Sequence, residues 1–228
     1  MEITPPIVGL HQTGPEPIDR TALRSDASFR RVSTASYYER HAERYADATL
    51  PIDTANRIAR FATMVPRGGR VLDAGCGSGR DLIGLREAGL KPEGLELSPR
   101  LAVIARRNSN VPVHVADICS PGLPLSSFDA VWAMASLLHV ERDDIEVALR
   151  SLNQLLVPGG LLFATLKSGT GRARDEGGRW FTLYEPRGWS GRLRNAGFSE
   201  VSVETERLVG MSPEPATGWI ASLARRPA

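Results

Sequence analysis

The chain has 228 residues, of which 42% are hydrophobic and 24% are charged, and its formal net charge is +2 at pH 7. This length and composition are typical of a globular protein that buries a full core, and the small net charge gives no argument for a nucleic-acid partner. No stretch approaches the roughly 18 apolar residues of a membrane span, and no basic segment followed by an apolar one opens the chain, so we expect a cytoplasmic protein.

Cysteine and histidine usage argues against a metal site. The two cysteines, Cys76 and Cys119, form neither a disulfide framework nor a metal-ligand pattern with the four scattered histidines. We therefore expect no metal ion.

Residues 1–33 contain four prolines and mixed polar residues without a sustained hydrophobic period. This composition predicts a flexible N-terminal arm. The arm is either an inert tail or a segment that orders over the active site when a ligand binds.

A helical cap is predicted over residues 34–66. Ser36 and Glu39 fit the S-x-x-E capping box, and Tyr38 and Tyr45 then share one helical face. A second helix is predicted after the next proline, where apolar side chains recur at helical spacing.

An apolar strand runs into a glycine-rich turn at residues 71–79, VLDAGCGSG. Val71 and Leu72 suit a buried strand, and the three glycines after Asp73 lack the Cβ atoms that keep a ligand away from the main chain. Helical spacing begins at Ser78, so the turn ends at a helix N-terminus. A strand, a glycine turn and a helix in this order predict a nucleotide-type ligand site.

The glycine spacing differs from the dinucleotide-binding fingerprint G-x-G-x-x-G. Gly79 comes one position early, Arg80 takes the place of the third fingerprint glycine, and Asp73 stands just before the turn. These features disfavour a pyrophosphate and tolerate a cation. The segment DAGCGSG, residues 73–79, is similar to the first motif of class I S-adenosylmethionine-dependent methyltransferases.

Two further carboxylates match that family. Glu96 ends the next apolar strand, 21 positions after Gly75, where the family's carboxylate accepts hydrogen bonds from the ribose hydroxyls. Asp117 ends a third predicted strand, 111–116, where the family's adenine-binding carboxylate falls, and Ile118 offers an apolar face. Taken singly, these features also fit a tight turn, a solvated glutamate at a strand end and an ordinary turn aspartate.

The resemblance implies S-adenosylmethionine as the cofactor. The cofactor contacts predicted on this basis are Tyr45, Asp73, Gly75, Cys76, Gly77, Arg80, Glu96, Leu97, Asp117, Ile118, Met134 and Ser136. Cys76 is expected to serve packing, because no histidine lies nearby in sequence to activate its thiol.

His139 is the predicted catalytic residue. It follows the fourth predicted strand, 128–135, and ligands of α/β sheets bind beyond the carboxyl ends of the strands. With an ordinary pKa of about 6.5, an imidazole here takes a proton from a hydroxyl or amine as the methyl group transfers. The alternative is a partly buried histidine that bonds a backbone carbonyl.

The remaining elements complete an α/β fold. We predict a helix over 142–156, a turn at 158–160, a strand over 161–166, a helix over 185–195, and strands over 198–208 and 219–224. The connection between the last two strands has no room for a crossover helix, so they should pair antiparallel. The predicted fold, spanning 67–228 beyond the cap, is a Rossmann-like, seven-stranded, mostly parallel sheet with an antiparallel C-terminal hairpin and helices on both faces.

Residues 167–185 are the clue to the methyl acceptor. Its glycines predict a mobile loop. The segment also carries a local excess of cations, among them Arg174. Arginine grips carboxylate or phosphate in a bidentate way, which favours a small anionic acceptor, while the aromatic residues that follow suit an aromatic one. Alternatively, the segment is a solvated loop that its aromatic side chains anchor.

The helix YYERHAERYAD also resembles the helix that closes over the methyl donor in many small-molecule methyltransferases. The residues predicted to contact the substrate are Tyr37, His41, Lys167, Arg172, Arg179, Trp180 and Tyr184.

The resemblance implies an enzyme that transfers a methyl group from S-adenosylmethionine to an N, O or C nucleophile of a small metabolite, acting as a monomer or homodimer. An RNA-modifying methyltransferase is the first alternative, but it calls for a larger basic face and preferably an added binding module. The second is a non-catalytic protein that binds the same cofactor.

Overall fold

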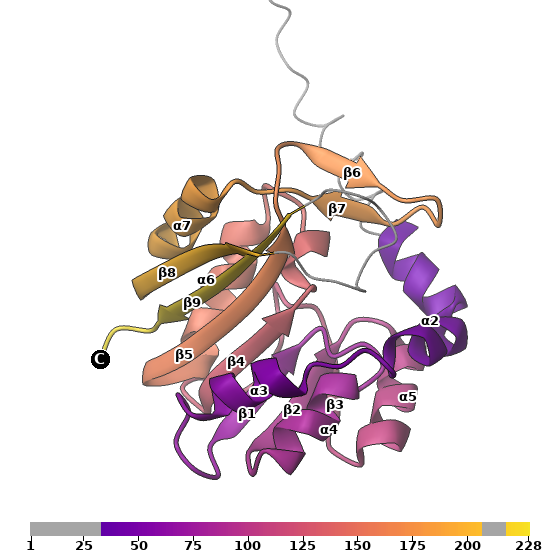
Figure 1. Ribbon diagram of the computed structural model, residues 1–228, viewed down its shortest axis with the longest axis horizontal. Coiled ribbons are helices and arrows are strands. Elements are labelled where there is room, and N and C mark those ends of the chain that lie inside the picture. The colour runs from indigo at the N-terminus through magenta and orange to yellow at the C-terminus, as the bar shows by residue number, and fades with distance from the viewer. Residues whose placement is uncertain (1–32, 207–217) are drawn as a thin grey trace, which may run out of the picture.

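The computed structural model describes residues 33–206 and 218–228 (Figure 1). The predicted N-terminal arm therefore lies almost entirely outside the described residues, as does the connection between the last two strands.

The centre of the molecule is a seven-stranded sheet with strand order β3-β2-β1-β4-β5-β9-β8. Its strands are β1 (Arg70–Ala74), β2 (Lys91–Glu96), β3 (Val113–Val115), β4 (Phe128–Met134), β5 (Leu156–Lys167), β8 (Ser199–Glu206) and β9 (Trp219–Arg225). The first five in this order pair in parallel, and β9 runs antiparallel to both β5 and β8. The predicted mostly parallel sheet with an antiparallel C-terminal hairpin is confirmed.

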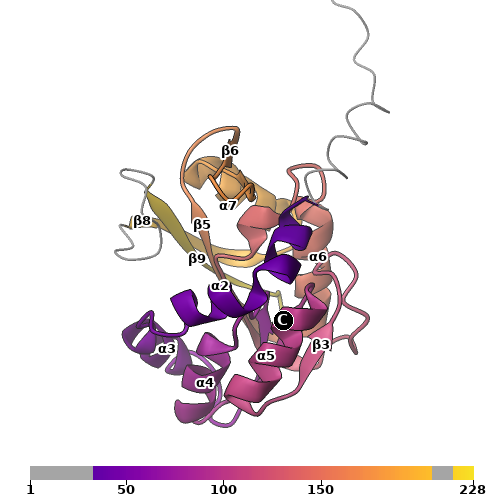
Figure 2. The same ribbon diagram turned by 90° about the vertical axis from the view of Figure 1, so that its right-hand side faces the viewer.

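Helices cover both faces of this sheet (Figures 1 and 2). They are α2 (Ala42–Thr49), α3 (Ala55–Ala62), α4 (Arg80–Glu87), α5 (Pro99–Ser109), α6 (Ile145–Leu155) and α7 (Pro186–Asn195). Successive residues of a strand face opposite layers. Leu72 and Val131 pack with α6 and α7, whereas Val71 and Trp132 pack with α3. Burial on both faces explains the continuous apolar runs of the central strands.

The predicted cap begins earlier than expected. Residues 33–40 are already helical, His41 forms a turn, and α2 follows directly. Apolar side chains of α2 pack on Leu101 and Ile104 of α5, so the two helices lie side by side (Figure 2). Thr49 of α2 also shares a hydrogen bond with Ser78, which places this part of the cap at the turn after β1. The division into arm, cap and methyltransferase domain stays a prediction.

The segment between β5 and α7 is not an irregular loop. Residues 172–174 and 180–182 form an antiparallel hairpin, β6 (Arg172–Arg174) and β7 (Trp180–Thr182), beyond the end of β5 (Figure 1). Backbone bonds link it to its surroundings: Gly169 donates to the carbonyl of Tyr184, and Leu183 donates to that of Gly171. The glycines thus shape turns of a hairpin, so the prediction of a loop was wrong, whereas the mobility of the segment stays a prediction.

One smaller difference concerns the start of β5. The turn predicted at 158–160 lies inside this strand, where the pairing with β4 shifts register and Gly159 has a φ of 76°. Residues 158–160 therefore form an irregular part of β5 near its start, not a turn before the strand.

Candidate cofactor and acceptor site

The glycine turn lies between β1 and α4, with Gly75, Gly77 and Gly79 at φ values of 82°, 53° and 82°. A Cβ atom on Gly75 would lie 2.4 Å from Cβ of Ser136, and one on Gly77 would lie 3.3 Å from Cε1 of Tyr45. Glycine is therefore needed here for two reasons. It adopts these backbone conformations readily, and it leaves room for the side chains of Ser136 and Tyr45 on either side of the turn.

Glu96 is fixed beside this turn at the end of β2. Its Oε2 accepts from the backbone N–H of Gly77 at 2.9 Å, and its Oε1 accepts from that of Ser98 at 2.9 Å. The residue is 8% exposed, and burial raises the pKa of its carboxyl above the ordinary value despite these hydrogen bonds. Each oxygen keeps a further lone pair, so the carboxylate can accept from hydroxyl groups in the pocket.

Two buried polar atoms near Gly75 lack partners within the described residues. They are Oδ2 of Asp73 and Oγ of Ser136. Burial raises the pKa of Asp73 well above its ordinary value, with nearby Asp81 adding to the effect and Arg80 opposing it. Because buried polar groups are normally hydrogen-bonded, these atoms call for donors supplied by a ligand. The ammonium group and hydroxyls of S-adenosylmethionine fit this requirement.

One pocket joins these features to the cap and to the start of α6. The predicted cofactor residues that line it are Tyr45, Gly75, Gly77, Glu96, Leu97, Asp117, Ile118 and Ser136. Asp117 also closes its own turn, since its Oδ1 accepts from the N–H of Cys119 at 2.8 Å. Asp117 therefore stabilises its own turn and also lines the pocket.

Four predicted cofactor residues do not line this pocket. Asp73 lies beneath the turn, and Cys76 packs into the core, where a Cβ on Gly94 would lie 2.7 Å from its Sγ. Arg80 forms an ion pair with Asp81, and Met134 packs in the core beneath α3. The thiol of Cys76 serves packing, as predicted, and burial raises its pKa well above the ordinary value.

His139 lies at the end of a short 3₁₀ helix, η1 (Leu137–His139), and lines the pocket. Its Nδ1 lies 2.8 Å from the carbonyl oxygen of Trp180, and its Nε2 lies 2.7 Å from the hydroxyl of Tyr38. A carbonyl only accepts, so Nδ1 carries the proton and Nε2 accepts from Tyr38. Burial lowers the pKa of His139 to about 4, so the ring is neutral at physiological pH. The ring bonds a backbone carbonyl and also lines the pocket, so the geometry is compatible with both interpretations of His139, the catalytic base and the buried structural histidine.

Tyr38 also lines the pocket, and the sequence did not single it out for a functional role. Its hydroxyl accepts from Nη1 of Arg179 at 3.3 Å while it donates to His139, and burial raises its pKa far above the ordinary value. Helical spacing placed Tyr38 on the face of Tyr45, which is equally typical of core aromatics. The pairing with His139, 101 residues away, has no local sequence pattern.

The predicted substrate residues are not gathered in this pocket. Arg172 pairs with Glu141 at 3.1 Å and Arg179 pairs with Asp175 at 2.7 Å, so protein carboxylates already engage both cations. Lys167 is buried, with Nζ 4.1 Å from the ring centre of Phe181. These cations of the segment 167–185, predicted to hold an anionic acceptor, therefore make separate contacts within the protein.

The aromatic residues predicted to contact the substrate are mainly structural in this geometry. Tyr184 is buried in the core with Arg142 over its ring, and Trp180 contributes its backbone carbonyl to His139. Tyr37 and His41 stack on each other at 4.5 Å between ring centres.

The strand order and the glycine turn, with Glu96 and Asp117 at the neighbouring strand ends, define a Rossmann-like fold of the class I methyltransferase type. Residues 71–160 match the model of the methyltransferase domain family. Over these residues the chain is similar to the class I S-adenosylmethionine-dependent methyltransferases, and its fold is the one that those enzymes share.

Relatives and solved structures agree with this assignment. The chain is 35% identical over 155 residues to a malonyl-[acyl-carrier protein] O-methyltransferase of Enterobacter lignolyticus, covering 66% of this chain and 55% of the relative. It is 34% identical over 119 residues to a ubiquinone biosynthesis O-methyltransferase of Methylocella silvestris, covering 48% and 46%. The chain thus spans about half the length of the curated relatives it matches.

A solved structure shares the fold over nearly the whole chain. It is the Burkholderia thailandensis 1,6-didemethyltoxoflavin-N1-methyltransferase with bound 1,6-didemethyltoxoflavin and S-adenosylhomocysteine, with a TM-score of 0.69, 19% identity and 94% of each chain covered. Across residues 33–206 and 218–228, no helix has the length and apolar character needed to cross a bilayer. The same residues contain no group of three or more His, Cys, Asp or Glu side chains arranged to hold a metal ion.

Proposed function

We propose that this chain binds S-adenosylmethionine and transfers its methyl group to an N, O or C nucleophile of a small molecule. The observation that carries the proposal is a pair of buried oxygens without partners among the described residues, one on Asp73 just before the glycine turn and one on Ser136, which lines the same pocket as the carboxylate of Glu96. Together they offer acceptors for an ammonium group at one end and for hydroxyls at the other.

When bound, the cofactor supplies a methyl group on a sulfonium, whose departure as a neutral thioether needs no acid. The chain's own residues bind and orient the reactants and exclude water. Tyr45 covers the glycine turn at Gly77, and Thr49 shares a 3.0 Å hydrogen bond with Ser78. These contacts support closure of the cap over the donor site.

His139 is the proposed catalytic residue, with a defined starting state. Its Nδ1–H is held by the Trp180 carbonyl, which leaves Nε2 as the only position that can accept a proton. Tyr38 donates to that position, so an acceptor hydroxyl or amine reaches Nε2 only by replacing or acting through the Tyr38 hydroxyl. An acceptor that is already deprotonated needs neither group.

The acceptor remains the open part of the proposal. Curated relatives are named as O-methyltransferases, and the structural neighbour as an N1-methyltransferase, so oxygen and nitrogen nucleophiles are both first choices for testing. We further propose a cytoplasmic monomer or homodimer acting on a small molecule, not a nucleic acid, since the formal net charge is only +2.

Isothermal titration with S-adenosylhomocysteine tests the cofactor site. Glu96→Gln should weaken binding about tenfold or more, because a charged acceptor for two hydroxyls becomes a neutral amide. Glu93→Gln is the matched control on the same strand, because Glu93 pairs with Arg70 and His114 outside the pocket. Incubation with isotope-labelled cofactor and a panel of acids, phenols and amines then tests transfer. A wild-type protein that binds no cofactor would refute the proposal.

A further inference from the structure

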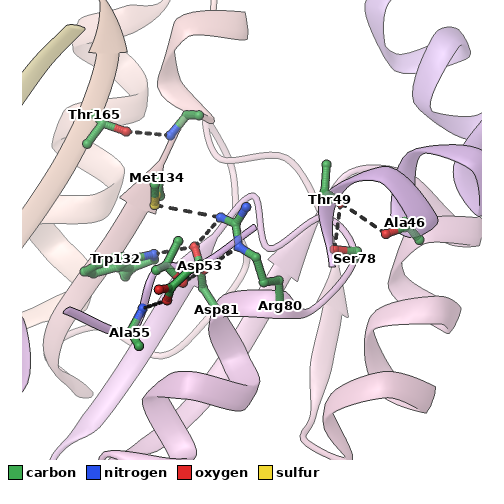
Figure 3. Close-up of polar contacts among 12 residues, drawn as sticks. Ala46, Thr49, Asp53, Ala55, Ser78, Arg80, Asp81, Trp132, Met134 and Thr165 are labelled. Atoms are coloured by element: carbon green, nitrogen blue, oxygen red, sulfur yellow. Dashed lines mark hydrogen bonds and ion pairs between the residues drawn. The ribbon is translucent and has the colours of Figure 1, made fainter. Parts of the chain in front are cut away.

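Asp81, the second residue of α4, is a buried carboxylate held by four hydrogen bonds (Figure 3). Its Oδ1 accepts from Thr54 Oγ1 at 2.8 Å and from Arg80 Nε at 2.7 Å. Its Oδ2 accepts from Arg80 Nη2 at 2.9 Å and from Trp132 Nε1 at 2.9 Å. Three elements therefore meet at one side chain: the N-cap of α3, the first turn of α4, and β4.

The bidentate pair fixes the plane of the Arg80 guanidinium. Nε and Nη2 are committed to Asp81, and Nη2 also lies 3.8 Å from Sδ of Met134. Among residues 33–206 and 218–228, Nη1 has no hydrogen-bond partner. A planar fork held on one edge presents its remaining donors in a fixed direction.

That direction matters because of what surrounds Arg80. Arg80 is the first residue of α4 and directly follows Gly79 of the glycine turn. Its guanidinium lowers the pKa of both Asp73 and Tyr45, opposing the increase that burial causes. The Arg80 side chain is only 15% exposed, which strengthens its interactions with neighbouring charges.

Two buried acids compete here for one cation. Asp81 takes the fork of Arg80, and Oδ2 of Asp73 is left without a partner. The two ends of the glycine turn therefore offer a carboxylate oxygen without a partner, on Asp73, and a guanidinium nitrogen that is not committed to Asp81, on Arg80. A ligand that carries both an ammonium and a carboxylate group satisfies both, and the amino-acid end of S-adenosylmethionine is such a group.

We propose that Asp81 is a positioning residue, which orients Arg80 toward the carboxylate of the bound donor and, by occupying Arg80, keeps Asp73 available for the ammonium group. This inference rests on the proposed function. It assigns no contact with the cofactor to Asp81 itself, and it treats Thr54 and Trp132 as the supports that hold Asp81 in place.

The competing explanation is a purely structural network, because the same bonds join α3, α4 and β4. Two ligands separate the explanations: S-adenosylhomocysteine carries the amino-acid group, and 5′-methylthioadenosine retains the adenosine and thioether without it. A positioning role predicts loss of affinity for the first ligand only. A structural role predicts equal losses for both.

The experiment measures both dissociation constants by titration calorimetry for the wild type, Asp81→Asn and Arg80→Lys. We expect Asp81→Asn to weaken S-adenosylhomocysteine about tenfold or more and 5′-methylthioadenosine less than about threefold. Asp129→Asn is the matched control, because Asp129 accepts from the backbone N–H of Arg70 away from the pocket. It should leave both affinities unchanged.

Equal losses for the two ligands, or no loss in Asp81→Asn, would overturn the positioning role. If Asp81→Asn does not fold, Arg80→Lys decides, since lysine keeps the charge without the fork: selective loss of S-adenosylhomocysteine supports the inference and unchanged binding overturns it. A wild-type protein that binds neither ligand overturns the proposed function as well, whereas wild-type binding without selective loss refutes only the role of Asp81.

Discussion

The hydroxyl of Tyr38 donates to Nε2 of His139 at 2.7 Å, and this bond ties the N-terminal cap to the loop after β4. The ring of Tyr38 also packs edge-on against that of His139, with 5.3 Å between their centres. Because Nδ1 of His139 is held by the Trp180 carbonyl, the cap and the β6–β7 hairpin meet on one imidazole. The contacts that hold the cap and the hairpin together are thus the same contacts that orient the imidazole of His139.

Tyr38→Phe keeps this packing and removes the hydroxyl. The buried Nε2 of His139 then loses its donor, and we expect the free energy of unfolding to fall by about 1–3 kcal/mol. Methyl transfer should fall more than cofactor affinity, because the change leaves Tyr45 in place over the glycine turn. Denaturant unfolding and titration with S-adenosylhomocysteine measure the two effects.

Tyr37→Phe is the matched control, since its ring stacks on His41 and no described residue hydrogen-bonds its hydroxyl. A fall in stability as large as that of Tyr38→Phe would show that the His139 bond is not the cause.

The sequence predicted the sheet, and most of the residues that it assigned to the cofactor line one pocket, because both depend on local patterns. Strands buried on both faces read as apolar runs. Glu96 is the last residue of β2, and Asp117 lies two residues beyond the end of β3. The sequence missed Tyr38, whose contacts with His139 and Arg179 join segments far apart in the chain. No local period reports that Arg179 pairs with Asp175 across a hairpin, so its charge looked available to a substrate.

Acid should destabilise the protein through His139. Burial lowers its pKa to about 4 in the folded state, against about 6.5 in the unfolded chain, so the unfolded state binds the proton more tightly. This contribution to stability is present above pH 6.5 and is lost as the pH falls toward 4, by about 3 kcal/mol in total.

Chemical denaturation at a series of pH values measures the effect, and His139→Asn isolates it. Asparagine keeps a donor near the Trp180 carbonyl and cannot titrate, so the variant should show a shallower loss between pH 6.5 and 4. Parallel curves for the wild type and the variant would refute a neutral, buried His139.

Arg179→Lys tests how much the arginine fork contributes. Arg179 pairs with Asp175 and donates to Tyr38, and its guanidinium lies 5.1 Å from the ring centre of Tyr37. A lysine cannot span these partners, so we expect a loss of about 1–2 kcal/mol in the free energy of unfolding. Arg174→Lys, whose guanidinium lies over Trp180, should change it by less than about 0.5 kcal/mol. Similar losses in the two variants would contradict the special position of Arg179.

A comparison of Gly75 in the glycine turn with Gly89 after α4 distinguishes the energetic cost of a left-handed backbone from the cost of close packing. Their φ values are 82° and 81°, but a Cβ on Gly75 would lie 2.4 Å from Cβ of Ser136, whereas one on Gly89 would meet no atom within 4 Å. Gly89→Ala should therefore cost about 1–2 kcal/mol for the left-handed conformation alone. Gly75→Ala should cost about 1–3 kcal/mol more, because β1 and the loop after β4 must separate. Denaturant titration of both variants gives the difference, and equal losses would mean that Ser136 does not pack against the turn.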